Sequence, residues 1–271
     1  MGAPNAPSPP RPLEEQWPRI RATIADATGI LVCLDFDGTL APIVEDPDAA
    51  MPTERNREAV ATLVDTPEIT TAVISGRALS DVRQRLEGPS IYAGNHGLEL
   101  ARDGDISVHP VAREHAARIE RLCAVLEVAL APVPNCRVEN KRLTGTVHFR
   151  AVPSAAVPTV RRLTHDIVDR FGGDTLELSP GKQILETGPD LTWGKGDAVE
   201  VIAADEPSET TVIYVGDDVT DESAFRAVEP DGLGIRVGGD EPSSASARVE
   251  SPADVADFLS WLGSTGVDLL E

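Results

Sequence analysis

Two carboxylates stand two residues apart in the segment Asp35-Phe36-Asp37-Gly38-Thr39, directly after the apolar run Ile30–Leu34. Such a run is typical of a strand that is buried on both faces of a parallel sheet. Ligands of open α/β sheets bind at the carboxyl ends of the strands, so Asp35 and Asp37 are candidates for a chemical role. A polar turn that only closes the strand is the structural alternative.

A second acidic cluster, Gly216-Asp217-Asp218-Val219-Thr220-Asp221-Glu222, follows the apolar run Val212–Val215. Some of these residues could instead cap a helix, since the helix dipole favours acids in the first turn. Two clusters at one sheet edge would bring several negative charges together, which is costly unless a cation lies among them. Carboxylate oxygens are hard ligands that select Mg²⁺, so the sequence predicts a magnesium site.

Small and basic side chains extend this set. Ser75 and Arg77 follow a third apolar run, Thr71–Ile74, and Lys195 begins an expected helix. The chain has only three lysines among its 24 basic residues: Lys141, Lys182 and Lys195. A compact ammonium group reaches a phosphate or carboxylate where a planar guanidinium does not fit, which makes these lysines candidate ligands. Ordinary surface lysines are the alternative.

The elements that must position these residues follow an alternating pattern. Helices are expected at Glu54–Val64, Ala78–Leu86, Lys195–Ala203, Glu222–Val228 and Ala253–Leu262. Strands that alternate with helices predict βαβ units, and therefore an α/β fold with a doubly wound, mainly parallel sheet.

The middle of the chain departs from this pattern. Two amphipathic helices, Ala112–Ala129 and Ala156–Arg170, are expected together with four short extended runs. This combination predicts a small α+β domain inserted into the sheet domain. We expect a flexible, proline-rich tail at residues 1–16. The predicted core domain comprises residues 17–109 and 187–271, and the predicted cap domain comprises residues 110–186.

Composition excludes several classes of function. The 24 basic and 45 acidic residues give a net charge of −21, which argues against nucleic acid and anionic membranes as partners. Three widely spaced cysteines favour a reducing compartment. The N-terminus has no secretory pattern, and no apolar run approaches the roughly 18 residues of a membrane helix. We therefore expect a cytoplasmic protein, and a monomer.

Four motifs in this order resemble those of the haloacid dehalogenase-like phosphatases. They are Asp35-Phe36-Asp37-Gly38-Thr39, Ser75 at a strand end, Lys195 before a helix, and Gly216-Asp217-Asp218-Val219-Thr220-Asp221. Shorter motifs are similar to those of the trehalose-6-phosphate phosphatase family: Tyr92-Ala93-Gly94-Asn95-His96-Gly97, Val138-Glu139-Asn140-Lys141, His148-Phe149-Arg150 and Gly181-Lys182-Gln183-Ile184-Leu185-Glu186. The resemblance covers Leu31–Phe225 and implies a Rossmann-like core with an inserted cap.

The resemblance implies a role for each core residue. Asp35 would be the nucleophile, and Asp37 would act as general acid and then as general base. Asp35, the backbone carbonyl of Asp37 and Asp217 would hold Mg²⁺. Ser75 and Lys195 would hold the phosphoryl oxygens. Three further residues would support the site: Arg77, Asp218 and Asp221, the last by orienting Lys195 or a metal-bound water.

The resemblance also implies a sugar-binding set. In the cap this set is Glu139, Lys141, Arg150, Lys182 and Glu186. In the core, Asn95 and His96 are further candidates for substrate contact. As an alternative, Glu139 with Lys141 and Lys182 with Glu186 are ordinary ion pairs. His148 is expected to be a packed strand residue.

The function that follows is Mg²⁺-dependent hydrolysis of trehalose 6-phosphate to trehalose and phosphate through an aspartyl-phosphate. The expected partner is thus a small-molecule sugar phosphate. One alternative is a related phosphatase for another glycosyl phosphate, such as sucrose phosphate or a glycosyl-phosphoglycerate. The others are a receiver-type phospho-aspartate signalling module and a catalytically silent sugar-phosphate sensor.

Overall fold

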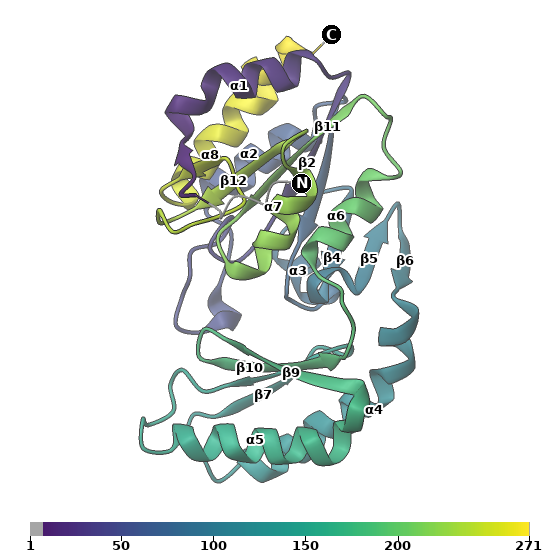
Figure 1. Cartoon of the computed structure of the whole chain (residues 1–271), viewed down its shortest axis with the longest axis vertical. Helices are drawn as coiled ribbons and strands as arrows, with labels where there is room; N and C mark the ends of the chain where they lie inside the picture. The colour runs from purple at the N-terminus through teal and green to yellow at the C-terminus, as the bar shows by residue number, and fades with distance from the viewer. Residues whose placement is uncertain (1–7, 271) are drawn as a thin grey trace, which may run out of the picture. The chain divides into compact units, whose positions relative to one another are not determined.

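The computed structural model describes residues 8–270 and divides the chain into two compact units (Figure 1). Of the described residues, the first unit comprises 8–106 and 193–270, and the second comprises Ser107–Thr192. The second boundary therefore falls after Thr192 and not after Glu186, because a strand of the second unit runs on to Pro189.

The first unit is built on one sheet with the strand order β1-β13-β12-β11-β2-β3-β4-β5-β6. The strands are β1 Arg11–Pro12, β2 Gly29–Leu34, β3 Ile69–Ile74, β4 Ile91–Gly94, β5 Glu99–Arg102, β6 Asp105–Val108, β11 Thr210–Gly216, β12 Leu233–Val237 and β13 Ala247–Val249. Neighbours from β1 to β4 pair in parallel, and β5 pairs antiparallel with β4. The predicted α/β fold with a mainly parallel sheet is confirmed.

Helices cover both faces of this sheet. They are α1 Leu13–Ala25, α2 Glu54–Val64, α3 Leu79–Arg85, α6 Lys195–Ala203, α7 Glu222–Val228 and α8 Pro252–Trp261. Ile30, Val32 and Leu34 of β2 join the buried cluster formed with α1, α2, α3 and α8. Leu31 and Cys33 join the cluster formed with α6 and α7. Because successive residues of a strand point to opposite faces, a strand buried on both faces is apolar throughout.

The predicted N-terminal tail is wrong for residues 11–16. Strand β1 pairs in parallel with β13, and α1 begins at Leu13. The helical spacing of Leu13, Ile20 and Ile24 places all three on the buried face of α1. The free energy gained by burying these side chains outweighs the tendency of the prolines to disrupt a helix. Residues 1–7 of the predicted tail lie outside the described residues.

The second unit is an α+β layer. Its antiparallel sheet has the order β7-β8-β10-β9. The elements are α4 Pro110–Leu130, β7 Arg137–Asn140, β8 Gly145–His148, α5 Val157–Gly172, β9 Leu176–Gly181 and β10 Ile184–Pro189. Val147 and Leu185 pack against apolar residues of α4 and α5, which lie on one side of the sheet (Figure 1). The other face of this sheet carries polar side chains.

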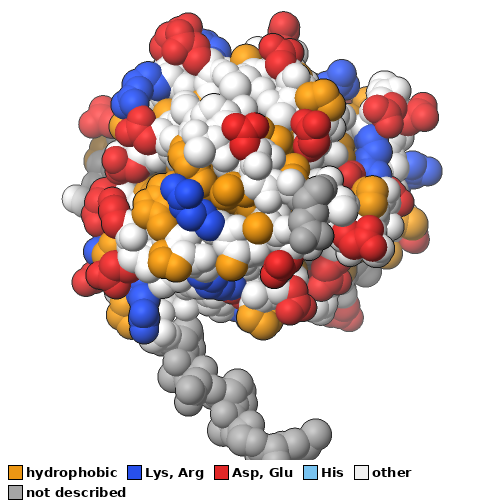
Figure 2. All heavy atoms as spheres, turned by 90° about the horizontal axis from the view of Figure 1, so that it is seen from above, with side chains coloured by type: hydrophobic (Ala, Val, Ile, Leu, Met, Phe, Trp, Pro, Cys, Tyr) orange, Lys and Arg blue, Asp and Glu red, His pale blue; other side chains and the backbone are white. Residues whose placement is uncertain are grey.

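The surface agrees with the net charge of −21. Acidic side chains are spread over the face shown in Figure 2, where basic side chains are fewer. Among residues 8–270, no helix combines the length and the apolar character that crossing a membrane requires.

Candidate active site

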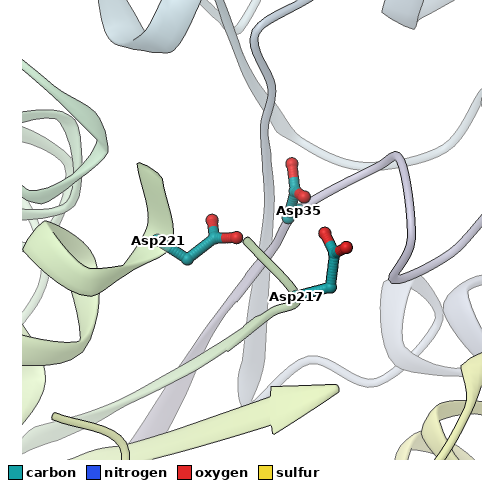
Figure 3. A group of neighbouring side chains, drawn as sticks. All are labelled: Asp35, Asp217 and Asp221. Atoms are coloured by element: carbon teal, nitrogen blue, oxygen red, sulfur yellow. The ribbon is translucent and has the colours of Figure 1, made fainter. Parts of the chain in front are cut away.

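Three carboxylates meet at the carboxyl edge of the large sheet. Asp35 follows β2, and Asp217 follows β11; Asp221 lies one helical turn further on. Strands β2 and β11 are parallel neighbours in which Leu34 pairs with Val215, so the two acidic motifs emerge side by side. One oxygen from each of the three carboxylates lies within 4.8 Å of the others (Figure 3). The expected convergence of the two clusters is thus present.

Lys195 joins two of these carboxylates from the first turn of α6. Its Nζ atom lies 2.7 Å from Oδ1 of Asp35 and 2.7 Å from Oδ1 of Asp221. All three side chains are buried. Burial alone would lower the pKa of Lys195, but the two carboxylates outweigh it and raise that pKa above its usual value. Lys195 therefore stays an ammonium group at neutral pH.

Asp221 is held by donors of the protein on both of its oxygens. Oδ1 accepts the hydroxyl of Tyr214 at 2.6 Å in addition to Lys195, and Oδ2 accepts the backbone N–H of Asp218 at 2.8 Å. This arrangement fits the interpretation that Asp221 orients Lys195. Tyr214 was missed by the sequence analysis, although a tyrosine inside an apolar run has a hydroxyl that needs a buried partner.

The carboxylates of the cluster influence one another. Burial raises the pKa of Asp35; the ammonium of Lys195 opposes this effect, and the carboxylates of Asp221 and Asp217 add to it. Lys195 contacts two of the three neighbouring carboxylates, those of Asp35 and Asp221. Gly38, at φ +86°, leaves room for the Asp217 carboxylate, because a Cβ atom there would lie 2.3 Å from it. A hard divalent cation fits a site at which oxygen atoms of three carboxylates lie this close together.

Asp37 has a different environment from Asp35. Its two carboxylate oxygens accept the Nε and Nη2 groups of Arg77, each at 2.7 Å. Burial would lower the pKa of Arg77, but its bonds with Asp37 and Asp81 raise it above the usual value. Arg77, predicted only as a supporting residue, is therefore the direct partner of Asp37.

The loops after β3 and β4 are tied to each other. The backbone N–H of Asn95 donates to the carbonyl of Arg77 at 2.7 Å, and that of His96 donates to the carbonyl of Ser75 at 2.9 Å. Asn95 and His96 adopt positive φ angles of 49° and 57°. The Asn95 amide is fully buried and donates to Glu99 at 2.6 Å. The structure therefore gives Asn95 a role in shaping this loop.

The imidazole of His96 lies over the loop that contains Ser75. A Cβ atom on Gly76 would lie 2.6 Å from the ring, so glycine at this position allows the close approach. Ser75 is buried at the end of β3, where its hydroxyl accepts the N–H of Arg77 at 3.2 Å.

A row of polar side chains crosses the cap sheet. Register pairs Glu139 of β7 with Thr146 of β8, Thr146 with Glu186 of β10, and Glu186 with Ser179 of β9. Directly paired residues point to the same face, and this face is opposite to the one that packs on α4 and α5. Lys141 directly follows β7, and its ammonium group reaches Glu186 of this face. The predicted sugar-binding residues of β7 and β10 thus lie together.

Two ion pairs in this row join residues from different segments of the cap. Lys141 contacts Glu186 at 2.9 Å, and Glu139 contacts His148 at 2.7 Å. Burial alone would raise the pKa of Glu139, but the hydrogen bond from His148 and the charge of Lys141 lower it. His148, expected only to pack in its strand, is thus a direct partner of Glu139. These partners come from different strands, so only the register of the sheet could have identified them.

Arg150 and Lys182 lie beyond the strand ends. Lys182 is exposed in the turn between β9 and β10, and an Nη2 atom of the exposed Arg150 lies 3.4 Å from its carbonyl. Two exposed basic residues are thus neighbours at the end of the β9–β10 hairpin.

Comparison with known families identifies the chain. A sequence profile described as trehalose-phosphatase matches residues 33–253. The chain belongs to the trehalose-phosphatase family. The matched region contains the acidic motifs, Lys195 and the cap sheet, so the family resemblance seen in the sequence is confirmed.

Mycobacterial proteins are among the similar relatives. A trehalose-phosphate phosphatase of Mycobacterium ulcerans is 37% identical over 243 residues, which cover 86% of this chain and 61% of that protein. One of Mycobacterium tuberculosis is 38% identical over 241 residues, covering 85% and 60% respectively. The present chain thus spans about three fifths of the length of these relatives.

Solved structures agree with this family. A trehalose-6-phosphate phosphatase related protein has a TM-score of 0.78 at 25% identity, covering 88% of this chain and 99% of its own. The C-terminal domain of C. albicans trehalose-6-phosphate phosphatase has a TM-score of 0.77 at 21% identity, covering 96% and 99%. The second likeness supports the fold alone.

Proposed function

We propose that this chain hydrolyses trehalose 6-phosphate to trehalose and inorganic phosphate with the help of Mg²⁺. The observation that carries the proposal is the buried contact of Asp35 with Lys195, beside Asp217, at the carboxyl edge of the sheet. A carboxylate next to a fixed ammonium group is suited to attack a phosphoryl group whose oxygens the same ammonium can bind. Membership of the trehalose-phosphatase family supports the substrate.

The metal proposal rests on the donor set. Asp35 and Asp217 would supply carboxylate oxygens and Asp37 its backbone carbonyl, whereas the oxygens of Asp221 are already engaged by Tyr214 and other donors. Mg²⁺ bound there would reduce the negative charge that an incoming phosphate meets.

The first chemical step transfers the phosphoryl group to Asp35. An oxygen of Asp35 forms a bond to phosphorus while the bond from phosphorus to the sugar oxygen breaks. The protonated carboxyl group of Asp37 gives its proton to that sugar oxygen, and trehalose leaves. Lys195 and Ser75 hold the phosphoryl oxygens in line during the transfer.

The second step returns the enzyme to its starting state. Asp37, now a carboxylate, takes a proton from water, and the water oxygen forms a bond to phosphorus. The bond from phosphorus to Asp35 breaks, which releases phosphate and leaves Asp37 protonated again. Splitting hydrolysis in this way requires two carboxyl groups in different environments, and Asp35 and Asp37 differ in this respect.

The cap sheet would recognise the sugar. Carboxylates of Glu139 and Glu186 can accept hydrogen bonds from vicinal hydroxyls, and Lys141, Lys182 and Arg150 can donate to them. A disaccharide carries many hydroxyl groups, so a polar sheet face with alternating donors and acceptors suits it.

A phosphate-release assay over a panel of sugar phosphates tests the proposed function. The panel contains trehalose 6-phosphate, sucrose 6-phosphate, a glycosyl-phosphoglycerate and glucose 6-phosphate, each with Mg²⁺. We expect kcat/KM for trehalose 6-phosphate to exceed the others by at least about a hundredfold, because unpaired polar groups penalise the wrong sugar. A higher value for sucrose phosphate or the phosphoglycerate would favour another glycosyl phosphate as substrate. Equal values for trehalose 6-phosphate and glucose 6-phosphate would contradict the specificity.

A further inference from the structure

Arg77 binds Asp37 through two parallel hydrogen bonds, an arrangement called a fork below. Nε of Arg77 donates to Oδ2 of Asp37, and Nη2 donates to Oδ1, both at 2.7 Å. The side chain of Arg77 is 11% exposed and that of Asp37 is 36% exposed, so the guanidinium side of the contact is shielded from water. A fork of this kind fixes the plane of the carboxylate as well as its position.

Other N–H groups of Arg77 also donate hydrogen bonds to acceptors of the protein. Nη1 donates to Asp81 at 2.8 Å, and Nη2 donates to the carbonyl of Pro47 at 2.8 Å. The guanidinium carbon also lies 5.3 Å from the centre of the Phe36 ring. A guanidinium has five N–H donors, and four of them are engaged here. Arg77 is therefore built to hold protein groups in place.

Arg85, the last residue of α3, offers a close comparison with Arg77, which lies in the loop before this helix. Its Nε group donates to Asp81 at 2.8 Å, and its Nη1 group donates to the carbonyl of Ala50 at 2.6 Å. Arg77 and Arg85 thus bind the same aspartate and the same loop, which contains Pro47 and Ala50. What distinguishes Arg77 in this comparison is its pair of hydrogen bonds to Asp37.

We propose that Arg77 is a positioning residue that holds the carboxyl group of Asp37 for both of its proton transfers. This inference rests on the proposed function, in which Asp37 protonates the leaving sugar oxygen and later accepts a proton from water. Each carboxyl oxygen has two lone-pair sites, so an oxygen that binds Arg77 can still exchange a proton at its other site. Without the fork, Asp37 would rotate about its side-chain bonds and spend less time aimed at the reacting oxygen.

The competing explanation is that Arg77 binds the substrate phosphate directly. The two explanations differ in how the effects of substitutions combine. If Arg77 acts through Asp37, its loss costs little once Asp37 has been disabled. If Arg77 binds phosphate, the two losses multiply.

The test is a double-mutant cycle on the full chain with Mg²⁺ and trehalose 6-phosphate. We expect Arg77→Gln to lower kcat by roughly 10- to 100-fold with little change in KM, since small misplacements of catalytic groups have costs of this order. In the Asp37→Asn background, Arg77→Gln should lower kcat by less than about threefold. Multiplied losses, or a rise in KM with kcat unchanged, would overturn the proposal.

Two further variants keep the result interpretable. Arg85→Gln removes the contacts to Asp81 and the loop but leaves the fork, and it should retain kcat within about threefold. An equal loss in Arg85→Gln and Arg77→Gln would overturn the proposal, because anchoring of the loop would then explain both. Arg77→Lys keeps the charge without the fork and should also lose kcat; it replaces Arg77→Gln in the cycle if that variant fails to fold.

The leaving group gives an independent readout. An aryl phosphate needs no proton on its departing oxygen, so single-turnover release of nitrophenol from p-nitrophenyl phosphate should fall much less in Arg77→Gln than release of trehalose. Equal losses on the two substrates would contradict positioning of Asp37. A wild-type protein that releases no phosphate from any sugar phosphate would contradict the proposed function itself, whereas multiplied losses in an active enzyme would contradict only this inference.

Discussion

The hydroxyl of Tyr214 donates to Oδ1 of Asp221 at 2.6 Å, and the same oxygen receives the ammonium group of Lys195 at 2.7 Å. Burial raises the pKa of the Tyr214 hydroxyl, and the charges of Asp221 and Asp35 raise it further. The hydroxyl is therefore a permanent donor. Through Asp221 it restrains the lysine that contacts Asp35.

Tyr214→Phe should weaken this restraint while keeping the ring, which packs edge-on against Phe225 at 5.5 Å. A hydrogen bond to a charged group is worth about 1.5–3 kcal/mol, so we expect a loss of about that size in the free energy of unfolding. We also expect kcat to fall roughly tenfold, because Lys195 loses part of its orientation. Urea unfolding and steady-state kinetics measure the two effects.

Tyr92→Phe is the matched control for this variant. The hydroxyl of Tyr92 is also buried and donates to the carbonyl of Leu86 at 2.9 Å, away from the carboxylate cluster. The control should lose stability but keep kcat. A normal kcat in Tyr214→Phe would show that the tyrosine serves the fold alone.

Magnesium should stabilise the folded protein. A ligand that binds only the folded state at 100 times its Kd adds about 2.7 kcal/mol, which raises the melting temperature by several degrees. The Asp217→Asn variant should lose this shift, and so should the wild-type protein after chelation. Asp257→Asn, which alters a surface carboxylate paired with Arg55, should keep it. Thermal unfolding with and without Mg²⁺ measures this change in melting temperature. The same change in Asp217→Asn as in wild type would contradict the proposed ligand set.

The cap should control sugar recognition without controlling the chemistry. Lys141→Met breaks the contact with Glu186 and removes a proposed sugar donor. We expect kcat/KM for trehalose 6-phosphate to fall by at least about tenfold, because a hydrogen bond from a charged group is lost. Activity on p-nitrophenyl phosphate should stay the same. Arg162→Met, which breaks an exposed ion pair on α5, should change neither value. Equal losses on both substrates would argue against sugar binding by Lys141.

The contact between Glu139 and His148 should make the stability of the protein depend on pH. The pKa of Glu139 is lower in the folded protein than in the unfolded chain, so its stabilising effect is present above the unfolded pKa and is lost as pH falls through the folded one. Wild type should therefore be more stable than Glu139→Gln at pH 6, and the difference should shrink on acidification. Urea unfolding from pH 6 to pH 3 measures it, and a constant difference would contradict the assignment.

The sequence predicted the parts of the site that depend on the ends of strands. The apolar runs before Asp35 and Asp217 indicate parallel strands buried on both faces, and such strands end at one edge. Side-chain partners could not be predicted in this way. The contact of Lys141 with Glu186 depends on the order and register of the cap strands, because these residues are far apart in the chain.

Two other features depended on tertiary structure. The fork between Arg77 and Asp37 joins loops after two different strands, and no spacing in the sequence encodes it. At the N-terminus, local proline content suggested a tail, whereas burial of Leu13 against the core produces a helix.

The central claim is that Asp35 attacks the phosphate of trehalose 6-phosphate. Its most direct test is the rate of phosphate release from this substrate, in the presence of Mg²⁺, by wild type and by Asp35→Asn. We predict a measurable turnover for wild type and a loss of at least about a thousandfold in the variant, which keeps the shape of the side chain but lacks a nucleophilic carboxylate. An Asp35→Asn variant that kept the full rate would contradict the account.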